Sequence, residues 1–158
     1  MTNINNYLNQ YIKELSKSIL RLEQKKLDSA ISLIFEKIKK NKNIFICGNG
    51  GSAAIANHYV CDFIKFFRDR TKFKPKIFSL SNNIETITAI SNDMKYDQIF
   101  KYQAESLVAK GDMIIIISSS GNSKNIKELL KFTNKKKIQT VGFSGFKGGY
   151  LKKNCTMS

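Results

Sequence analysis

Apolar positions along this chain first recur at helical spacing and then alternate between short β-branched runs and further helical stretches. The first 41 residues predict two helices. The first carries Leu8, Tyr11, Ile12, Leu15, Ile19 and Leu22 on one face, and the second spans about 24–40. Beyond them, strands are expected at 43–47, 76–80, 112–117 and 138–143, with helices at 52–68, 84–91, 96–109, 123–135 and about 148–154. Such alternation is typical of a parallel sheet with helices on both faces.

We therefore expect an α/β fold, a doubly wound parallel sheet preceded by two N-terminal helices, in one domain spanning 1–158. The helical pair of residues 1–41 is expected to pack on that domain. The first helix is more apolar than a small sheet needs, so part of its stripe is expected in a subunit interface, with packing on its own sheet as the alternative. Right-handed crossovers and the common strand order 2-1-3-4 would place the first and third strands side by side, where ligands of such sheets bind.

Two short loops follow those two strands and suggest an anion site. They read Cys47-Gly48-Asn49-Gly50-Gly51-Ser52 and Ser118-Ser119-Ser120-Gly121-Asn122-Ser123, and each opens a predicted helix. Backbone N–H groups and serine hydroxyls can donate to an anion there, glycines permit close approach, and the helix dipole favours negative charge. Tight strand-to-helix turns need Gly and Ser in any case, so two unrelated turns are the alternative. A shared phosphate pocket is the favoured interpretation.

The composition limits the kinds of partner that the chain is expected to bind. The chain has 158 residues, of which 42% are apolar and 25% charged, with no leader and no apolar run of membrane-spanning length, so we expect a cytoplasmic protein with no membrane partner. Three cysteines without metal-ligand spacing are expected to be reduced and mostly buried. The net charge is +15, but the lysines are spread over nearly every segment and are not interleaved with aromatic residues. This pattern disfavours nucleic acid as a partner and favours attraction of phosphorylated substrates.

The helix predicted at 52–68 carries the clearest candidates for chemistry. Its circumference is mostly apolar, but Ala54, His58, Asp62 and Lys65 form a separate stripe. His58, the only histidine, stands one turn from Asp62, and the pair could share a proton, bind a metal or act on a substrate anchored by its phosphate. The alternative is a solvated helix face. Asn92-Asp93, after another predicted helix, is by itself more typical of a cap and turn.

The chain resembles the sugar isomerase (SIS) domain family, in its phosphoheptose isomerase branch. The resemblance rests on the order and spacing of the first loop, His58, Asn92-Asp93 and the second loop, and it extends from about Tyr7 to Cys155. The resemblance implies a flavodoxin-like SIS fold, a homotetramer with sites at subunit boundaries, and a role in heptose synthesis for lipopolysaccharide or capsule. It implies a phosphorylated sugar bound by Asn49, Gly50, Gly51, Ser52, Asp93, Ser118, Ser119, Ser120 and Ser123. Some relatives bind zinc at the positions of His58 and Asp62, so zinc is an expected cofactor to test, and no nucleotide cofactor is implied.

The resemblance favours an isomerase that converts sedoheptulose 7-phosphate to glycero-manno-heptose 7-phosphate through an enediolate, with Asp62 as catalytic base and His58 as its partner. Two departures stand against full activity. The family has glutamate where Asp62 stands, and it continues past the position of Ser158 with a strand and a helix that carries a catalytic histidine. The sequence is then either a fragment or lacks that second group, and we expect it to bind phosphosugars but to isomerise them very slowly or not at all. The alternative is a non-catalytic SIS protein that binds a phosphosugar or a replication initiator.

Overall fold

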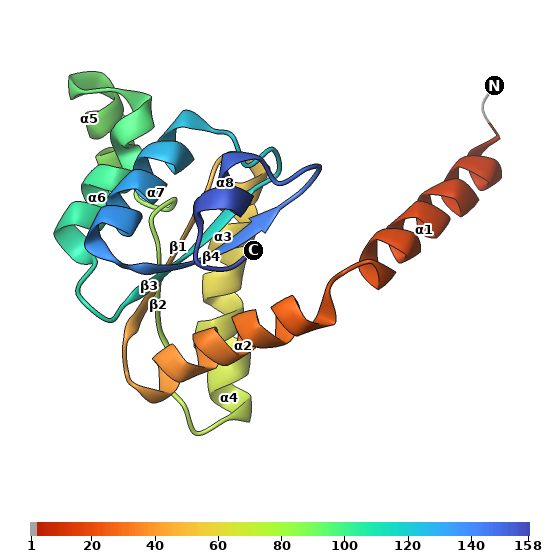
Figure 1. Cartoon of the computed structure of the whole chain (residues 1–158), viewed down its shortest axis with the longest axis horizontal. Helices are drawn as coiled ribbons and strands as arrows, with labels where there is room; N and C mark the ends of the chain where they lie inside the picture. The colour runs from red at the N-terminus through yellow and green to blue at the C-terminus, as the bar shows by residue number, and fades with distance from the viewer. Residues whose placement is uncertain (1–2) are drawn as a thin grey trace.

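A four-stranded parallel sheet forms the centre of the molecule, in a computed structural model that describes residues 3–158 (Figure 1). Its strands are β1 (Asn43–Gly48), β2 (Lys76–Ser79), β3 (Met113–Ser118) and β4 (Gln139–Ser144), in the order β2-β1-β3-β4. All three pairings are parallel. Residues 113–116 of β3 have no exposed surface, as expected for a strand covered on both faces. The predicted α/β class and strand order are confirmed.

Helices cover both faces of the sheet. They are α1 (Ile4–Leu20), α2 (Gln24–Lys39), α3 (Gly51–Asp62), α4 (Arg68–Arg70), α5 (Ile84–Asp93), α6 (Ile99–Leu107), α7 (Lys124–Lys136) and α8 (Gly149–Asn154). One face packs Ile44 and Ile46 of β1 against α2 and α3. The other face packs Phe45 and Cys47 against the helices from α5 to α8. Alternate residues of one strand thus supply two cores. None of the helices in residues 3–158 has the length and apolar character needed to cross a membrane.

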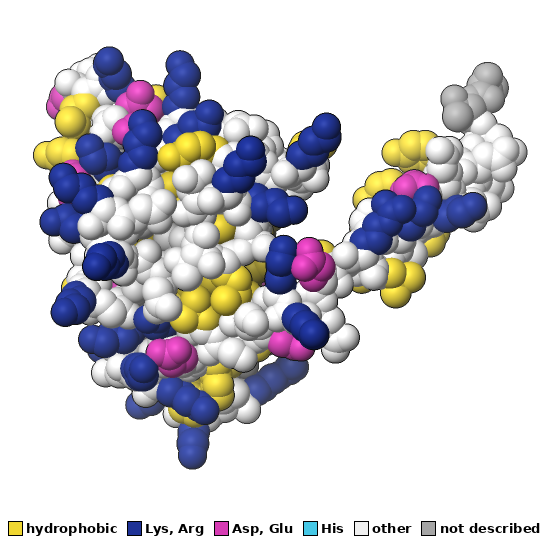
Figure 2. Space-filling model, viewed as in Figure 1, with side chains coloured by type: hydrophobic (Ala, Val, Ile, Leu, Met, Phe, Trp, Pro, Cys, Tyr) yellow, Lys and Arg dark blue, Asp and Glu magenta, His cyan; other side chains and the backbone are white. Residues whose placement is uncertain are grey.

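The predicted packing of both N-terminal helices on the sheet is wrong for the first of them. α2 buries Ala30, Leu33, Ile34 and Ile38 against the sheet. α1 extends away from the rest of the chain and buries no residue, so its apolar side chains lie exposed along it (Figures 1 and 2). The reason is that α2 and α3 together already cover this face of the sheet. The apolar stripe of α1 has no partner within the described chain.

The helix predicted at 52–68 is interrupted. After α3 the chain forms a π-helical turn, η1 (Phe63–Phe67), and then the short α4. Tyr59, Phe63 and Phe67 stack on one another at centroid distances of 4.9 and 5.2 Å and pack against the core below α3. Such turns occur often at functional sites, and this one begins directly after Asp62.

Candidate functional site

The two loops predicted to hold an anion lie next to each other. Gly48 at the end of β1 pairs with Ile117 of β3, so both loops leave the same edge of the sheet. The Asn49 side chain donates to Asn125 Oδ1 at 2.9 Å and accepts from Asn125 Nδ2 at 2.8 Å. Asn125 is the second residue of α7, so this amide pair joins the starts of α3 and α7.

The helices that follow these loops begin without side-chain caps. Gly50 precedes α3, with a positive φ of 52°, and Ser123 precedes α7; neither makes a side-chain capping bond. Asn3 caps α1 and Asn83 caps α5, whereas α2 and α6, like α3 and α7, begin without a side-chain cap. The first amides of a helix have no partner inside the helix. At α7 the N–H groups of residues 124–126 have no acceptor among the described residues and are available to an anion, whereas at α3 the Ser52 and Ala53 N–H groups already donate to the Asn49 and Gly50 carbonyls at 2.9 Å, which leaves the Gly51 N–H.

The two loops contain five serines. Ser118 is buried, Ser52 and Ser123 are half-buried, and Ser119 and Ser120 are exposed. Ser120 Oγ accepts from the Asn122 N–H at 3.2 Å. Within residues 3–158, none of the five hydroxyls donates to another protein atom. Each hydroxyl therefore has a proton free for a ligand.

The second loop is braced by the segment that follows β4. Gly145 N–H donates to the Ser119 carbonyl, and Leu151 N–H to the Gly121 carbonyl, both at 2.9 Å. Gly121 has a φ of 64°, and a Cβ there would lie 2.0 Å from the Gly148 carbonyl oxygen. In the sequence, the glycine-rich stretch 145–149 resembles a turn whose glycines could equally serve loop chemistry, so its bracing role was not predicted.

His58 and Asp62 project from an exposed face of α3. His58 Nε2 lies 3.6 Å from Asp62 Oδ2, and the two side chains are 75% and 44% exposed. The predicted pairing of the two groups is therefore present. His58 follows Ser52 by six residues, about 9 Å along the helix axis at 1.5 Å per residue. Among the described residues, nothing shields the pair from solvent as a reaction centre requires.

Asp93 is the last residue of α5, where it accepts from the Asn92 side chain at 2.9 Å. Three residues later Tyr96 opens the 3₁₀ turn η2 (Tyr96–Gln98), and its hydroxyl donates to Asn49 Oδ1 at 3.0 Å. The corner that carries Asp93 is thereby fixed beside the first loop. Both the cap-and-turn and the ligand interpretations of Asp93 are compatible with this place.

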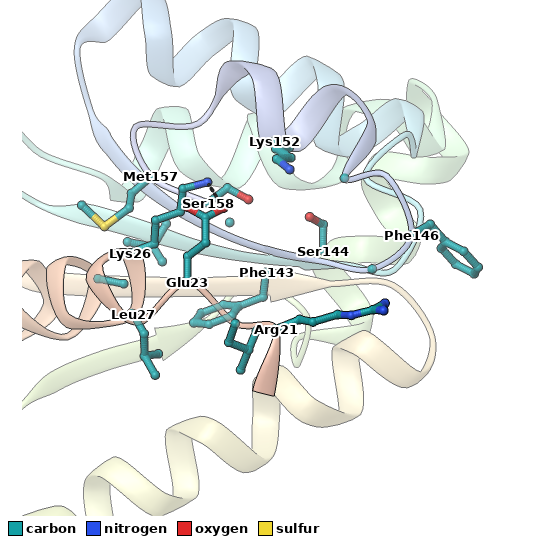
Figure 3. A pocket seen from close by; sticks show the side chains of 16 residues that line it. Arg21, Glu23, Lys26, Leu27, Phe143, Ser144, Phe146, Lys152, Met157 and Ser158 are labelled. Carbon is teal, nitrogen blue, oxygen red and sulfur yellow. Dashed lines mark ion pairs between the residues drawn. The ribbon is translucent and has the colours of Figure 1, made fainter. Parts of the chain in front are cut away.

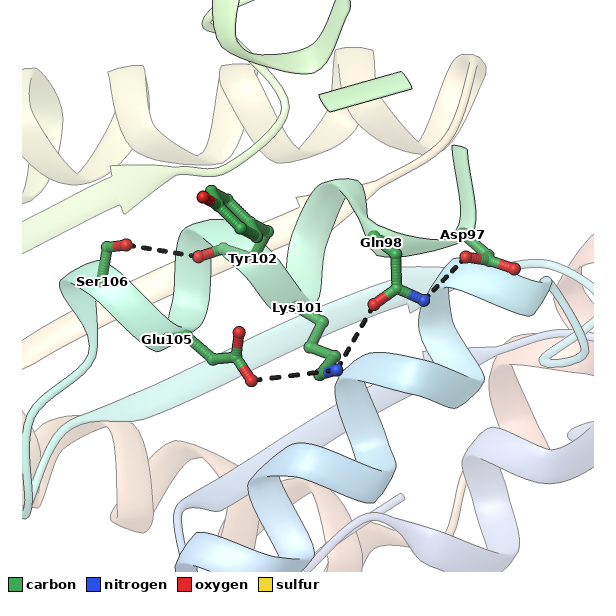
Figure 4. A network of polar contacts seen from close by, with 6 residues as sticks. All are labelled: Asp97, Gln98, Lys101, Tyr102, Glu105 and Ser106. Atoms are coloured by element: carbon green, nitrogen blue, oxygen red, sulfur yellow. Dashed lines mark hydrogen bonds and ion pairs between the residues drawn. The ribbon is translucent and has the colours of Figure 1, made fainter. Parts of the chain in front are cut away.

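Side-chain contacts connect η2 to α6, the helix that follows it in the chain (Figure 4). Gln98 donates to Asp97 at 2.7 Å and accepts from Lys101 at 3.4 Å, and Lys101 lies 3.8 Å from Glu105. The chain of contacts runs from η2 along α6. Tyr96 is therefore held at the end of a supported helix rather than on a free loop.

The site does not form a zinc centre by itself. His58 and Asp62 are two donors, whereas protein zinc sites take three or four protein ligands. No group of three His, Cys, Asp or Glu side chains suited to a metal occurs in residues 3–158. We therefore derive no step through zinc.

The three cysteine thiols differ in how deeply they are buried. Burial raises the pKa of the Cys47 thiol, so Cys47 at the end of β1 stays protonated and serves the core rather than the chemistry. Cys155 is half-buried, and burial raises its pKa as well. Cys61 on α3 is exposed, so the expectation of mostly buried thiols is wrong for this residue.

Two hollows open on the surface outside the predicted site residues, the first of them beside the segment that braces the second loop. A cavity of about 370 Å³ sits between α2 and the end of β4, with Arg21, Lys26, Phe143 and Lys152 among its lining residues (Figure 3). A second, of about 780 Å³, runs along the outer edge of β2 beside Phe78. No predicted site residue lines either cavity. The loops instead face open surface at the end of the sheet.

Comparison with known proteins bears on this arrangement. Residues 6–145 match the family model described as the SIS domain. Phosphoheptose isomerase of Campylobacter concisus is 34% identical over 157 residues, which cover 99% of this chain and 82% of that protein. Phosphoheptose isomerase 2 of Campylobacter jejuni is 42% identical, covering 94% and 78%. The structure of a phosphoheptose isomerase from Francisella tularensis superposes with a TM-score of 0.86 at 25% identity, covering 97% and 79%.

The chain therefore belongs to the SIS domain family and, within it, to the phosphoheptose isomerases. The resemblance based on the two loops, His58 and Asn92-Asp93 is confirmed at this level.

Proposed function

We propose that this protein isomerises a ketose phosphate to an aldose phosphate, with sedoheptulose 7-phosphate as substrate. One observation supports this most strongly. Two uncapped helix N-termini meet at the end of the sheet, and α3, which supplies one of them, also carries the His58–Asp62 pair. In this proposal α3 serves both anchoring and proton transfer.

The phosphate binds, in this proposal, at the first and second loops. The first amides of α7 and the hydroxyls of Ser52, Ser118, Ser120 and Ser123 donate to its oxygens. In this proposal Ser119 and the amides of Gly50 and Gly51 contribute as well. Asp93 has a different role, because a carboxylate repels a phosphate; it accepts from a sugar hydroxyl.

The chemistry is a proton transfer between neighbouring carbons. Asp62 removes a proton from the hydroxyl-bearing carbon next to the carbonyl, and the electron pair of that C–H bond moves to give an enediolate. The proton returns to the former carbonyl carbon, while the hydroxyl proton of the neighbouring oxygen moves to the former carbonyl oxygen, and the aldose results. His58, 3.6 Å from Asp62, orients the carboxylate and donates to the developing oxyanion.

An enediolate needs protection from water, and the His58–Asp62 pair is open in a single chain. We propose that a homo-oligomer, a tetramer, supplies the cover. Support comes from α1, whose apolar stripe is unburied. We also propose a cytoplasmic location, because the three cysteines form no disulfide among the described residues and reduced thiols are typical of that compartment.

A non-catalytic phosphosugar-binding role is the second candidate. The observation that favours it is Asp62 itself, since an aspartate base reaches about 1 Å less far than the family's glutamate, and such a displacement can cost about 10²-fold in rate.

Deuterium exchange separates the two. Sedoheptulose 7-phosphate is incubated with the protein in D₂O, and exchange at the carbons beside the carbonyl is followed by NMR. We expect slow incorporation, reduced about 10²-fold or more in Asp62→Asn and increased in Asp62→Glu. Binding of the sugar with no exchange above the Asp62→Asn background would support the non-catalytic role.

A further inference from the structure

Asn49 stands in the first loop where a ligand contact is expected, yet its side chain is already engaged. Its Oδ1 accepts from both Asn125 Nδ2, at 2.8 Å, and the Tyr96 hydroxyl, at 3.0 Å. Its Nδ2 donates to Asn125 Oδ1 at 2.9 Å. An amide oxygen has two lone pairs, so both are used, and one N–H remains.

The two partners come from distant parts of the chain. Asn125 lies 76 residues from Asn49 and Tyr96 lies 47 residues from it. Asn125 is 2% exposed, and a buried amide that loses its partners costs free energy. Loss of the Asn49–Asn125 pair is therefore costly in free energy, and the pair fixes the spacing between the first turns of α3 and α7.

We propose that Asn125 and Tyr96 are positioning residues, which hold Asn49 so that the amides of both loops converge on one phosphate. This inference rests on the proposed function and deepens it. The Tyr96–Asn49–Asn125 contact also joins the corner that carries Asp93 to the phosphate loops. Misplacement of either loop weakens binding because each amide must point at the same anion.

Tyr96→Phe tests the proposal with little risk to folding, because it removes only a hydroxyl from a side chain that is 56% exposed. We expect the affinity for sedoheptulose 7-phosphate, measured by calorimetry, to fall about two- to tenfold, the range of one neutral hydrogen bond, with an unchanged melting temperature. The control is Tyr102→Phe on α6, whose hydroxyl has no bonding partner in residues 3–158; it should bind as the parent does.

A double-mutant cycle measures whether the effects of the two substitutions on binding affinity are coupled, which a merely structural role would not produce. In an Asn125→Ala background, Tyr96→Phe should cost less than in the parent, because both act through Asn49. Parent-like affinity in Tyr96→Phe, or fully additive losses, would overturn the inference while leaving the proposed function standing. A parent chain that binds no sugar phosphate at all would overturn the proposed function, and the inference with it.

Discussion

The phosphate end of the candidate site (the first and second loops) and its proton-transfer end (His58 and Asp62) differ in what holds them. The phosphate end is fixed by contacts from three segments: Tyr96 in η2, Asn125 in α7 and the brace after β4. The proton-transfer end has one contact of 3.6 Å on an exposed helix face.

This difference indicates that one chain organises binding by itself but leaves the chemistry exposed. Anion recognition needs only donors that converge, and the parallel strands β1 and β3 deliver them to one edge. Proton transfer to carbon also needs exclusion of water, which a single helix face cannot provide. The experiments below perturb one end at a time.

The largest effect is expected at the brace of the second loop. Gly121→Ala would place a methyl group 2.0 Å from the Gly148 carbonyl oxygen at a positive φ, and should cost about 3 kcal/mol or more in unfolding free energy. Thermal unfolding should show a melting temperature lower by about 6–12 °C.

Gly51→Ala in the first loop is the matched control, because a Cβ there meets no atom within 4 Å. Its stability should stay within about 0.5 kcal/mol of the parent. Equal losses in the two variants would contradict the view that the brace, rather than loop glycines in general, fixes this end.

Local signals were enough to predict the sheet and the two loops. The β-branched runs of β1 and β3 end in Gly and Ser, and this pattern depends only on neighbours in the chain. The Asn49–Asn125 pair could not be predicted, because an Asn in a helix's first turn looks like many others until its partner is known. The 2% exposure of Asn125, which marks it as engaged, is visible only in the structure.

The place of α1 could not be predicted for a related reason. Its periodicity specifies a helix with an apolar stripe, but which surface covers the stripe depends on the space left by α2 and α3. The π-helical turn after Asp62 likewise follows from aromatic stacking in the core, which helical spacing alone does not reveal.

A smaller effect on the single chain is expected at α1. Ile12→Lys combined with Ile19→Lys should leave each folded domain intact, because neither side chain is buried, but should convert an oligomer to monomers. Light scattering measures the mass. The control with equal added charge is Asn6→Lys combined with Gln10→Lys on the opposite face, which should retain the parent's assembly. A parent chain that is monomeric would contradict the proposed cover.

The shared phosphate end is tested most directly by calorimetric titration of sedoheptulose 7-phosphate into Ser52→Ala and Ser120→Ala, with Ser106→Ala on α6 as control. Hydrogen bonds to a charged group contribute about 1.5–3 kcal/mol each, so each loop variant should bind about tenfold more weakly or worse. The Ser106 variant should bind as the parent does. Parent-like affinity in both loop variants would contradict the claim that the two loops hold one phosphate.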